Sequence, residues 1–527
     1  MQKIIRYHRS TSGESILSGA LSLTLGIMIV KLLGFFYKIP LSHLIGEEGM
    51  GYFNSAYTIY SFFFVLSSAG VPKAVSLLMG EARAKGLWNT EKRIFRFSLL
   101  LFGLLGLLLS MILGIFSLPL SRLVGIENGA LTLLLLSPTV TFVTLGGVLR
   151  GTLSAWEAQS PIAISQVIEA VCKLVCGMLF ALLGRAMGWP IRIVCAASIL
   201  GITLGSLLSF IYLSARVRAY AGFSDGREDF VPIKMIAIRL FRILTPVTLS
   251  AALLSVSALV DLYLIVNRLC ASGCSVADAN RLYGTYSTVA QPMLGLVSAI
   301  VGAITLAVMP HLTRRSVLRE EEERERLVGL TTRISAGLTV FMAFSFLFFS
   351  DEIVYLLFPR EMGAVGAACL CASAPSVIFL GILMSVNTAL EAGGYVRVPL
   401  FTTLFGLAFK IPISYFLIAD AEFGILGASI GTAVSYGISM LVSLVLYRKA
   451  YPMAKSPLFG TFTTVLYGAF ASVLARLSAD LIDQGSPTLS GVLISFSLFA
   501  LLYFAIFLFT SREELPGWVK LSKSTKS

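Results

Sequence analysis

The chain has 527 residues, of which 56% are hydrophobic and only 13% are charged. Soluble domains usually carry about 25% charged residues, so this composition excludes an ordinary soluble protein and indicates that lipid is the solvent. The formal net charge is +13. Its basic residues lie between apolar runs, a pattern that orients membrane helices, so we do not expect a nucleic-acid partner.

Long apolar runs follow one another along the whole chain. Each can cross a hydrocarbon core of about 30 Å as a helix, and each is too long for a barrel strand of about 10 residues. The first run is too long for a signal peptide and should remain as the first helix. The sequence predicts an all-α polytopic membrane protein with about fourteen transmembrane helices. The predicted spans are 16–42, 50–79, 95–119, 130–155, 160–184, 190–214, 240–267, 282–310, 332–358, 364–390, 397–419, 424–447, 457–479 and 488–510.

Most of the Lys and Arg residues lie in alternate connections between the predicted helices. They precede the first helix, follow the second, and fill the connections at 215–239 and 311–330. Basic connections stay on the cytoplasmic side of a membrane. We therefore expect both termini in the cytoplasm of a multi-pass plasma membrane protein, with the segment "GEEGMG" at 46–51 outside.

An internal repeat divides the chain. The segment "SPTVTFVTLGGVLRGTLSAWEA" from Ser137 aligns without a gap with "APSVIFLGILMSVNTALEAGGY" from Ala374, and the same offset places Lys173 on Lys410. Six predicted helices separate the copies, so both enter the membrane in the same direction, with a substrate site expected between parallel halves. This predicts an N-terminal lobe at 1–230 (helices 1–6), a C-terminal lobe at 231–450 (helices 7–12), and helices 13 and 14 with a cytoplasmic tail at 451–527.

Charged side chains at membrane depth cost roughly 2.5–3.5 kcal/mol each to insert, so they mark candidate functional residues. Four lie nearest the middle of predicted helices, and four polar residues accompany them. The predicted cavity residues are Lys31, Lys173, Lys410, Glu169, Asn54, Tyr57, Gln291 and Asn387. Together they suit an anionic substrate in a water-filled, net-cationic cavity.

A structural alternative exists for several of these charges. Glu169 and Lys173 are one helical turn apart and could simply neutralise each other. Lys38 and Arg150 lie nearer the helix ends and are expected to extend toward the membrane interface. Asp261, in helix 7, has no obvious local partner and could be an ion-coupling site or a structural partner of Arg268.

Signatures of enzymes are missing from the sequence. His8, His43 and His311 have no ligand spacing with Cys or carboxylates, so no metal site is expected. There is no Walker loop and no dinucleotide fingerprint, so we expect neither an enzyme nor a cofactor. Transport would then draw on a coupling ion, either proton or sodium, or on the membrane potential. Cys270 and Cys274 lie in a predicted outer loop, and the sequence does not decide whether they form a disulfide.

Several stretches carry a resemblance to a known family. The most telling are Leu33-Gly34-Phe35, Gly46-Glu47-Glu48-Gly49 and the run from Ser67 to Pro72, followed by "RGTLSAWEAQSPIAISQVIEAVCKL" from Arg150 and "LYGTYSTVAQPM" from Leu282. With these segments the chain resembles the stage V sporulation protein B group of polysaccharide transporters. That group is related to the lipid II flippases and belongs to the superfamily that includes multidrug and toxin extrusion antiporters.

The resemblance implies two six-helix lobes, alternating access and a role in bacterial cell-wall or sporulation polysaccharide synthesis. It implies that the cargo is a polyprenyl-diphosphate-linked glycan, such as a peptidoglycan-type precursor, and that the protein also contacts membrane lipid. Lipid II flippases carry arginine at the places of Lys31 and Tyr37, whereas this chain keeps one cation and lacks the other, so another lipid-linked sugar is also open. The alternative is a cation-coupled multidrug antiporter. The excess of mid-membrane lysine over carboxylate favours the flippase.

Overall fold

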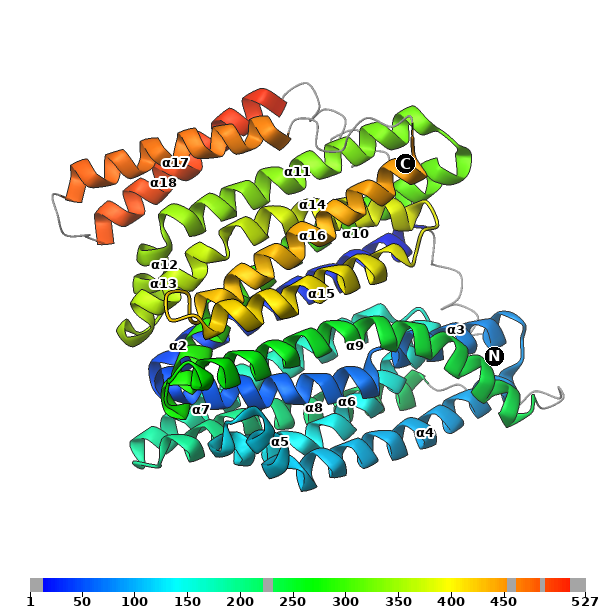
Figure 1. Cartoon of the computed structure of the whole chain (residues 1–527). Coiled ribbons are helices and arrows are strands. Elements are labelled where there is room, and N and C mark those ends of the chain that lie inside the picture. Colours follow the sequence, from blue (N-terminus) through cyan, green and yellow to red (C-terminus); the bar gives the residue numbers. More distant parts are fainter. Residues whose placement is uncertain (1–12, 221–230, 453–460, 484–488, 512–527) are drawn as a thin grey trace. The chain divides into compact units, whose positions relative to one another are not determined.

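The structure is a computed structural model that describes residues 13–220, 231–452, 461–483 and 489–511. Within these ranges the chain is built from helices and contains no strand (Figure 1). The predicted all-α class is therefore confirmed. The backbone at Lys31 is helical, but its side chain lies outside what the structure describes.

The helices follow one another with short connections. They are α2 Gly13–Ser68, α3 Val71–Ala84, α4 Trp88–Ile115, α5 Ser117–Val124, α6 Ala130–Ala155, α7 Gln159–Ala186, α8 Ile191–Tyr220, α9 Ile233–Ala271, α10 Val276–Leu318, α11 Glu321–Phe348, α12 Ser350–Leu357, α13 Gly363–Ala372, α14 Ala374–Ala392, α15 Val398–Ala419, α16 Leu426–Ala450, α17 Thr461–Asp483 and α18 Leu489–Ser511. Two short 3₁₀ turns lie at Glu127–Gly129 and Arg360–Met362.

The membrane-spanning segments agree with the predicted architecture. Among the described residues, eleven helical segments are long and apolar enough to cross a bilayer, and shorter apolar helices lie at Phe462–Leu477 and Ile494–Thr510. The first of the eleven, Leu32–Ala84, contains a bend at Gly46, where φ is 65° and ψ is −174°. A left-handed φ of this kind suits glycine, which has no Cβ to clash. The bend divides this segment into two crossings, consistent with a total of about fourteen.

Contacts between Cα atoms divide the chain into two units, Met1–Gly284 and Thr285–Ser527. Helix α10 begins in the first unit and continues into the second. The predicted lobes at 1–230, 231–450 and 451–527 follow the sequence repeat and remain a prediction.

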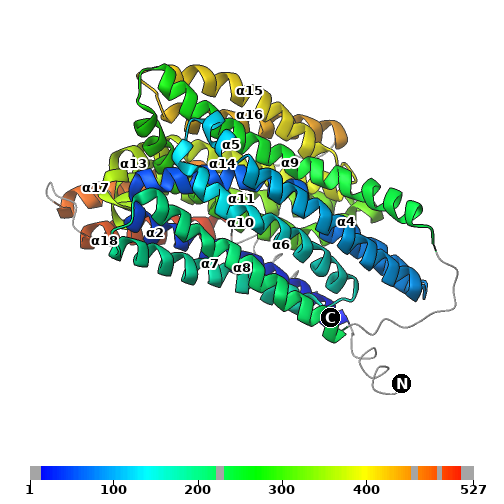
Figure 2. The ribbon, with the colours of Figure 1, turned by 90° about the horizontal axis from the view of Figure 1, so that it is seen from below.

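In the first unit, α7 and α8 pack closely and also contact α2 and α6 (Figures 1 and 2). Gly201 and Gly205 form a G-x-x-x-G pattern on α8. A Cβ on Gly205 would lie 2.7 Å from the carbonyl oxygen of Glu169 on α7. Small residues let helix backbones approach in lipid, where apolar burial alone does not drive helix association. This contact fixes the position of α7, the helix that carries the central charges.

In the second unit, α15 packs against α16, α14 against α11 and α16, and α17 against α18 (Figure 1). Aromatic rings join α11 to α18, since the ring of Phe341 lies 5.0 Å from those of Phe499 and Phe504. Offset and tilted ring pairs of this kind add roughly 0.5–1.5 kcal/mol beyond simple burial. The second unit is therefore held by an aromatic cluster as well as by helix pairing.

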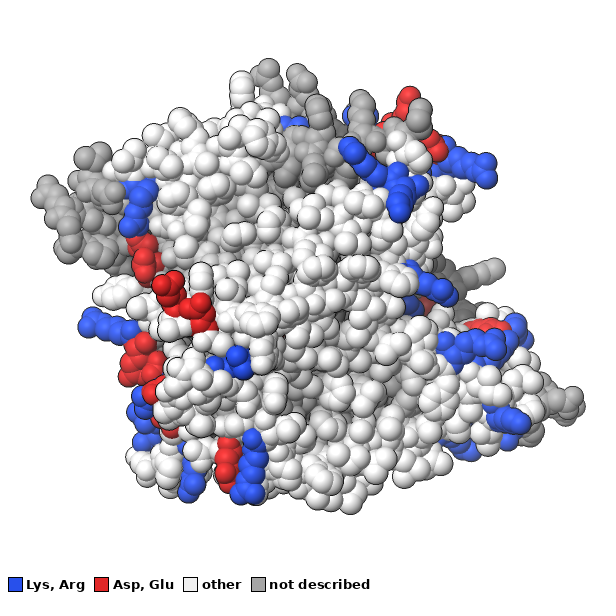
Figure 3. Space-filling model, in the orientation of Figure 1, with Lys and Arg blue, Asp and Glu red and all other residues white. Residues whose placement is uncertain are grey.

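Charged side chains on the face shown in Figure 3 gather near the helix ends, and the middle of the helices is uncharged there. Large apolar side chains are exposed along the helices, for example Leu100 at 65% and Phe416 at 70%. Such exposure is costly in water and normal in lipid. The protein is a multi-pass membrane protein. All seven cysteines are free, so Cys270 and Cys274 are not paired in the structure.

Candidate substrate site

Lys173 lies near the middle of α7 and its ammonium group is held between two aromatic rings of α2. Its Nζ atom is 5.3 Å from the centre of the Tyr37 ring and 5.0 Å from the centre of the Tyr57 ring. Both distances fall within the range of a cation–π interaction, which contributes about 0.5–2 kcal/mol depending on solvation. The structure thus brings Lys173 and Tyr57 together, and Tyr37 joins them.

The sequence of α2 and α7 explains how the two rings reach Lys173. Tyr37 and Tyr57 lie on opposite sides of the bend at Gly46, so both arms of α2 approach the same turn of α7. Gly177 follows Lys173 by one turn, and a Cβ there would lie 2.6 Å from the Tyr37 hydroxyl oxygen. A glycine at this place leaves room for the buried phenol. Tyr57 is further supported by stacking on Phe53, with ring centres 6.5 Å apart.

Glu169 binds Arg150 of α6 and not Lys173. The Arg150 Nη2 atom lies 2.9 Å from Oε2 of Glu169, and the guanidinium also donates to the hydroxyls of Ser165 at 3.3 Å and Ser209 at 3.1 Å. The Arg150 side chain is only 17% exposed. The prediction that Arg150 extends toward the interface was therefore wrong, because its charge is used between α6, α7 and α8.

The Arg150–Glu169 pair changes the electrostatic character of the site. Within the part of the chain that the structure describes, no carboxylate lies within 4.0 Å of the Lys173 ammonium. Lys38, half-buried one residue after Tyr37, lies close enough for the two lysine charges to repel. Because the Glu169 carboxylate is bound to Arg150, its negative charge is already balanced and does not offset the charge of Lys173.

Asn54 and Asp261 are buried polar residues of the first unit. Asn54 lies on α2 and is 3% exposed, while Asp261 lies on α9 and is 7% exposed. Both have interaction partners, as does Arg268. A structural pairing of Asp261 therefore stays open, and its role in ion coupling stays a prediction.

In the second unit, Lys410 lies on the face of α15 that packs against α16. This face is formed by buried residues one turn apart, namely Thr402, Gly406, Lys410, Ser414 and Ile418. A Cβ on Gly406 would lie 2.7 Å from the carbonyl oxygen of Ser435 on α16. Lys410 is 7% exposed and has an interaction partner. The surroundings of Lys410 are thus more tightly packed than those of Lys173.

Asn387 connects three helices of the second unit. Its side-chain oxygen accepts a hydrogen bond from Ser443 of α16 at 2.7 Å, and its nitrogen donates to Thr402 of α15 at 3.4 Å. Gln291, the remaining predicted cavity residue, is half-buried on α10 next to Pro292. Asn387 therefore has a visible structural role in addition to its predicted one.

The hydrogen bonds of Asn387 repeat those of Arg150. At the offset that aligns Lys173 with Lys410, Arg150 corresponds to Asn387 and Ser165 corresponds to Thr402. In each unit the first residue donates to the hydroxyl of the second, at 3.3 Å and 3.4 Å. Two independent pairs have no reason to share this geometry, so the shared contact supports the internal repeat.

A second polar group, which was not selected from the sequence, surrounds the Gly46 bend. Arg281 at the start of α10 lies 3.5 Å from Glu48 and 3.9 Å from Glu47, and Tyr52 donates to Glu48 at 2.8 Å. Asn280 donates to the backbone oxygen of Glu48 at 3.0 Å. Exposed ion pairs contribute about 0–1 kcal/mol each, so this group stabilises the bend through the sum of several weak contacts. The repeated acidic pair in "GEEG" was the available signal.

The fold is shared with membrane transporters of known structure. The chain superposes on a structure of the lipid II flippase MurJ in an inward closed conformation with a TM-score of 0.71 and 15% identity, covering 94% of this chain and 99% of that one. An inward-facing multidrug resistance MATE family transporter of the MOP superfamily gives a TM-score of 0.64 with 16% identity, covering 82% and 97%. These likenesses define a polytopic transporter fold.

Sequence comparison then assigns the family. A family described as polysaccharide biosynthesis protein matches residues 16–316, and the chain belongs to this family. Stage V sporulation protein B of Bacillus subtilis (strain 168) is 24% identical over 459 residues, covering 84% of this chain and 85% of that protein. Lipid II flippase MurJ of the same organism is 27% identical over 172 residues, or 31% of each chain. The resemblance derived from sequence motifs is therefore confirmed.

Proposed function

We propose that the protein is an alternating-access flippase that moves a lipid-linked oligosaccharide or a peptidoglycan-type cell-envelope precursor across the bacterial plasma membrane. The observation that carries the proposal is the ammonium group of Lys173, held by Tyr37 and Tyr57 while the nearby carboxylate of Glu169 is bound to Arg150. The family and the relative named as a lipid II flippase support it.

The chemistry of the proposed cargo matches this arrangement. A polyprenyl diphosphate is anionic, and lysine binds phosphate as a point charge. Lys173, with Lys38 near it, would attract the diphosphate, and the Arg150–Glu169 pair would keep the acidic charge of Glu169 from repelling it. Lys31 and Lys410 are proposed as further cationic contacts, with Asn54, Gln291 and Asn387 as polar contacts to the same cargo.

We propose that Asp261 contributes to coupling by a proton, a sodium ion or the membrane potential. It is a buried carboxylate in a membrane-spanning helix, a location where ionisable groups often serve ion pathways. Moving one charge across 100 mV yields about 2.3 kcal/mol, which shifts a two-state equilibrium by about fiftyfold. We expect Asp261→Asn to reduce the dependence of transport on the ion gradient or voltage, measured in liposomes with an imposed gradient. Unchanged dependence in a folded variant would make the residue structural.

A cation-coupled multidrug antiporter is the second candidate function. The shared fold with the inward-facing MATE transporter and the buried carboxylate of Asp261 favour it. The ammonium group of Lys173 argues against it, since it would repel an organic cation while Glu169 is bound to Arg150.

Transport by the reconstituted protein distinguishes the two candidates. Liposomes containing the full chain are given either a fluorescent lipid-linked sugar or a panel of cationic dyes. We expect translocation of the lipid-linked sugar, a loss in Lys173→Ala, and no loss in the matched control Lys73→Ala, which removes an exposed lysine of α3. Translocation of the dyes without the lipid would establish the antiporter instead.

A further inference from the structure

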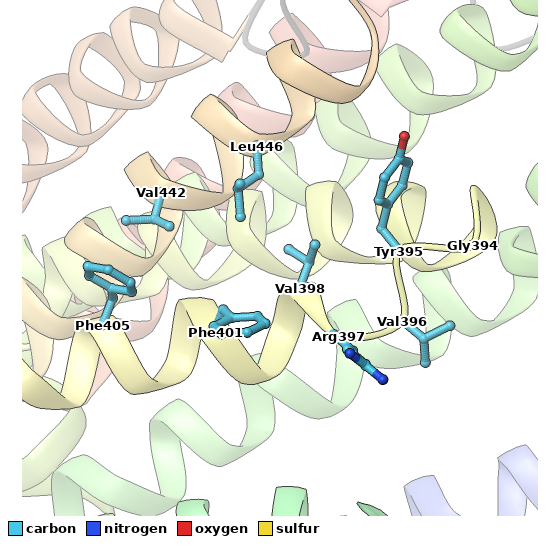
Figure 4. Close-up of a pocket in the computed structure, with 9 residues that line it drawn as sticks. All are labelled: Gly394, Tyr395, Val396, Arg397, Val398, Phe401, Phe405, Val442 and Leu446. Atoms are coloured by element: carbon cyan, nitrogen blue, oxygen red, sulfur yellow. The ribbon is translucent and has the colours of Figure 1, made fainter.

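A hollow apolar groove lies between α15 and α16, in the second unit. Its cavity has a volume of about 710 Å³. Figure 4 shows Phe401 and Phe405 of α15 beside Val442 and Leu446 of α16, with the loop that carries Tyr395 and Arg397 at one end. Gly394, Val396 and Val398 complete the lining. The groove is apolar along its length and polar at one end, as a lipid molecule is.

The polar end of the groove is basic. Arg397 directly precedes α15 and is the charged residue among those that line the groove. Arg448 and Lys449 lie in the last turn of α16, which meets the start of α15 because the two packed helices are joined by a short connection. All three side chains are exposed. This end of the helix pair is the one predicted to face the cytoplasm, where anionic lipid headgroups attract basic side chains.

The loop at the mouth has a defined conformation. Gly394 has a φ of +91°, and Gly393 packs directly against the Tyr451 hydroxyl, which leaves no room for a side chain. The Tyr395 ring lies edge-on to the Tyr451 ring at 6.3 Å, and the guanidinium of Arg324 covers Tyr451 at 3.8 Å. These contacts hold the loop that carries Arg397 at the groove before any ligand binds. Less conformational entropy is therefore lost on binding.

The side chains of the groove walls are partly uncovered. Phe401 and Phe405 are 51% and 52% exposed although they are large apolar side chains. A hollow of this kind would be filled by an acyl chain, and adjacent basic side chains favour a headgroup of net negative charge over a zwitterionic one. We infer that the groove binds an anionic phospholipid of the cytoplasmic leaflet, with an acyl chain between α15 and α16 and its phosphate at Arg397. This inference does not depend on the proposed cargo.

Photolabelling of the full-length protein tests the inference. A phosphatidylglycerol that carries a photoreactive acyl chain is titrated into the purified protein, and labelled peptides of 393–405 and 442–446 are quantified. We expect unlabelled phosphatidylglycerol to compete better than phosphatidylcholine with the same chains. Arg397→Gln should weaken phosphatidylglycerol binding about fivefold, the effect of removing one basic residue near a membrane surface. Val442→Trp, which fills the groove, should abolish labelling of these peptides.

Arg319→Gln is the matched control, because it removes an exposed arginine from the same unit and the same predicted side of the membrane. It should leave labelling unchanged. Three results would overturn the inference: equal competition by phosphatidylcholine, an equal effect of Arg319→Gln, or labelling that spares both peptides. Stronger competition by polyprenyl diphosphate would also overturn it, since the groove would then belong to the cargo.

Discussion

The helices α7 and α15 carry aligned lysines in the two units, and these lysines have different surroundings. On α7, Lys173 faces the two tyrosine rings of α2 and lies one turn after Glu169. On α15, Lys410 lies in a row of small residues packed against α16, and Gly406 stands where α7 has Glu169. The repeat therefore preserves the position of the cation and of the Arg150 or Asn387 contact, while the acidic residue occurs in one copy alone.

The two units show that a buried charge requires its partner, whereas a neutral pair requires no counter-charge. Arg150 and Glu169 neutralise each other in the first unit, whereas Asn387 and Gly406 at the same positions carry no charge at all. Removing one charge of a buried pair is strongly destabilising, but replacing both by neutral groups need not be. Each unit thus satisfies its polar groups in its own way, and a lysine occupies the aligned position in both.

The largest expected effect comes from breaking the pair in the first unit. Arg150→Ala leaves Glu169 without its cation, so we expect a loss of about 2–3 kcal/mol in the free energy of unfolding, below the 3–5 kcal/mol of fully buried pairs because both side chains are partly exposed. Thermal or denaturant unfolding in detergent measures this. The double variant Arg150→Asn with Glu169→Gln, which imitates the neutral second unit, should recover most of the loss. Arg185→Ala, an exposed arginine at the end of α7, serves as control. Equal stability of Arg150→Ala and the wild type would show that the Arg150–Glu169 pair does not stabilise the fold.

Removing either aligned lysine should chiefly affect transport. A charged hydrogen bond to phosphate contributes about 1.5–3 kcal/mol, so Lys173→Ala and Lys410→Ala should each reduce transport of the lipid-linked sugar by about tenfold or more. Lys173→Arg should restore part of the activity, since charge is kept but shape is changed. Initial rates in liposomes provide the measurement. A loss confined to Lys173→Ala would show that the two lysines, although aligned, do not share a function.

The smallest expected effect lies in the neutral network of the second unit. Asn387→Ala removes the bonds to Ser443 and Thr402, and side-chain hydrogen bonds between membrane helices average about 0.6 kcal/mol. We expect a loss of about 1 kcal/mol in the free energy of unfolding, less than for Arg150→Ala. Asn267→Ala is the control, because that amide donates to the backbone of its own helix at 2.9 Å. A loss as large as that of Arg150→Ala would mean that charge is not what distinguishes the two units.

The fold could be predicted from the sequence because the hydropathy and length of each apolar run can be read from consecutive residues. Apolar runs and glycine positions determine helices locally, so the class and the approximate number of spans followed. The sequence indicated the repeat through Pro138 and Pro375, and the offset already contained the correspondence between Arg150 and Asn387. What it did not reveal is which helices meet, and for this reason Glu169 was considered with Lys173, its neighbour in sequence, and not with Arg150.

The aromatic contacts of Lys173 were beyond the sequence for a similar reason. In the sequence, Tyr57 is a polar residue of the second predicted span, and Tyr37 stands where related flippases carry arginine. The two rings reach Lys173 only because the chain changes direction at Gly46. That change depends on the backbone conformation of a single residue. Asp261 has no obvious partner along its own helix in the sequence, yet it has one in the structure.

Because of the bend at Gly46, the distances from Lys173 to the Tyr37 and Tyr57 rings depend on the angle between the two arms of α2. At 1.5 Å per residue, Tyr37 lies about 13 Å from the bend and Tyr57 about 16 Å from it. A change of ten degrees in that angle moves either ring by about 2–3 Å relative to the other arm. The rings now lie 5.3 Å and 5.0 Å from the ammonium group, and a cation–π contact fades beyond about 6 Å. A small rotation at one glycine is therefore enough to release the lysine from one of its rings.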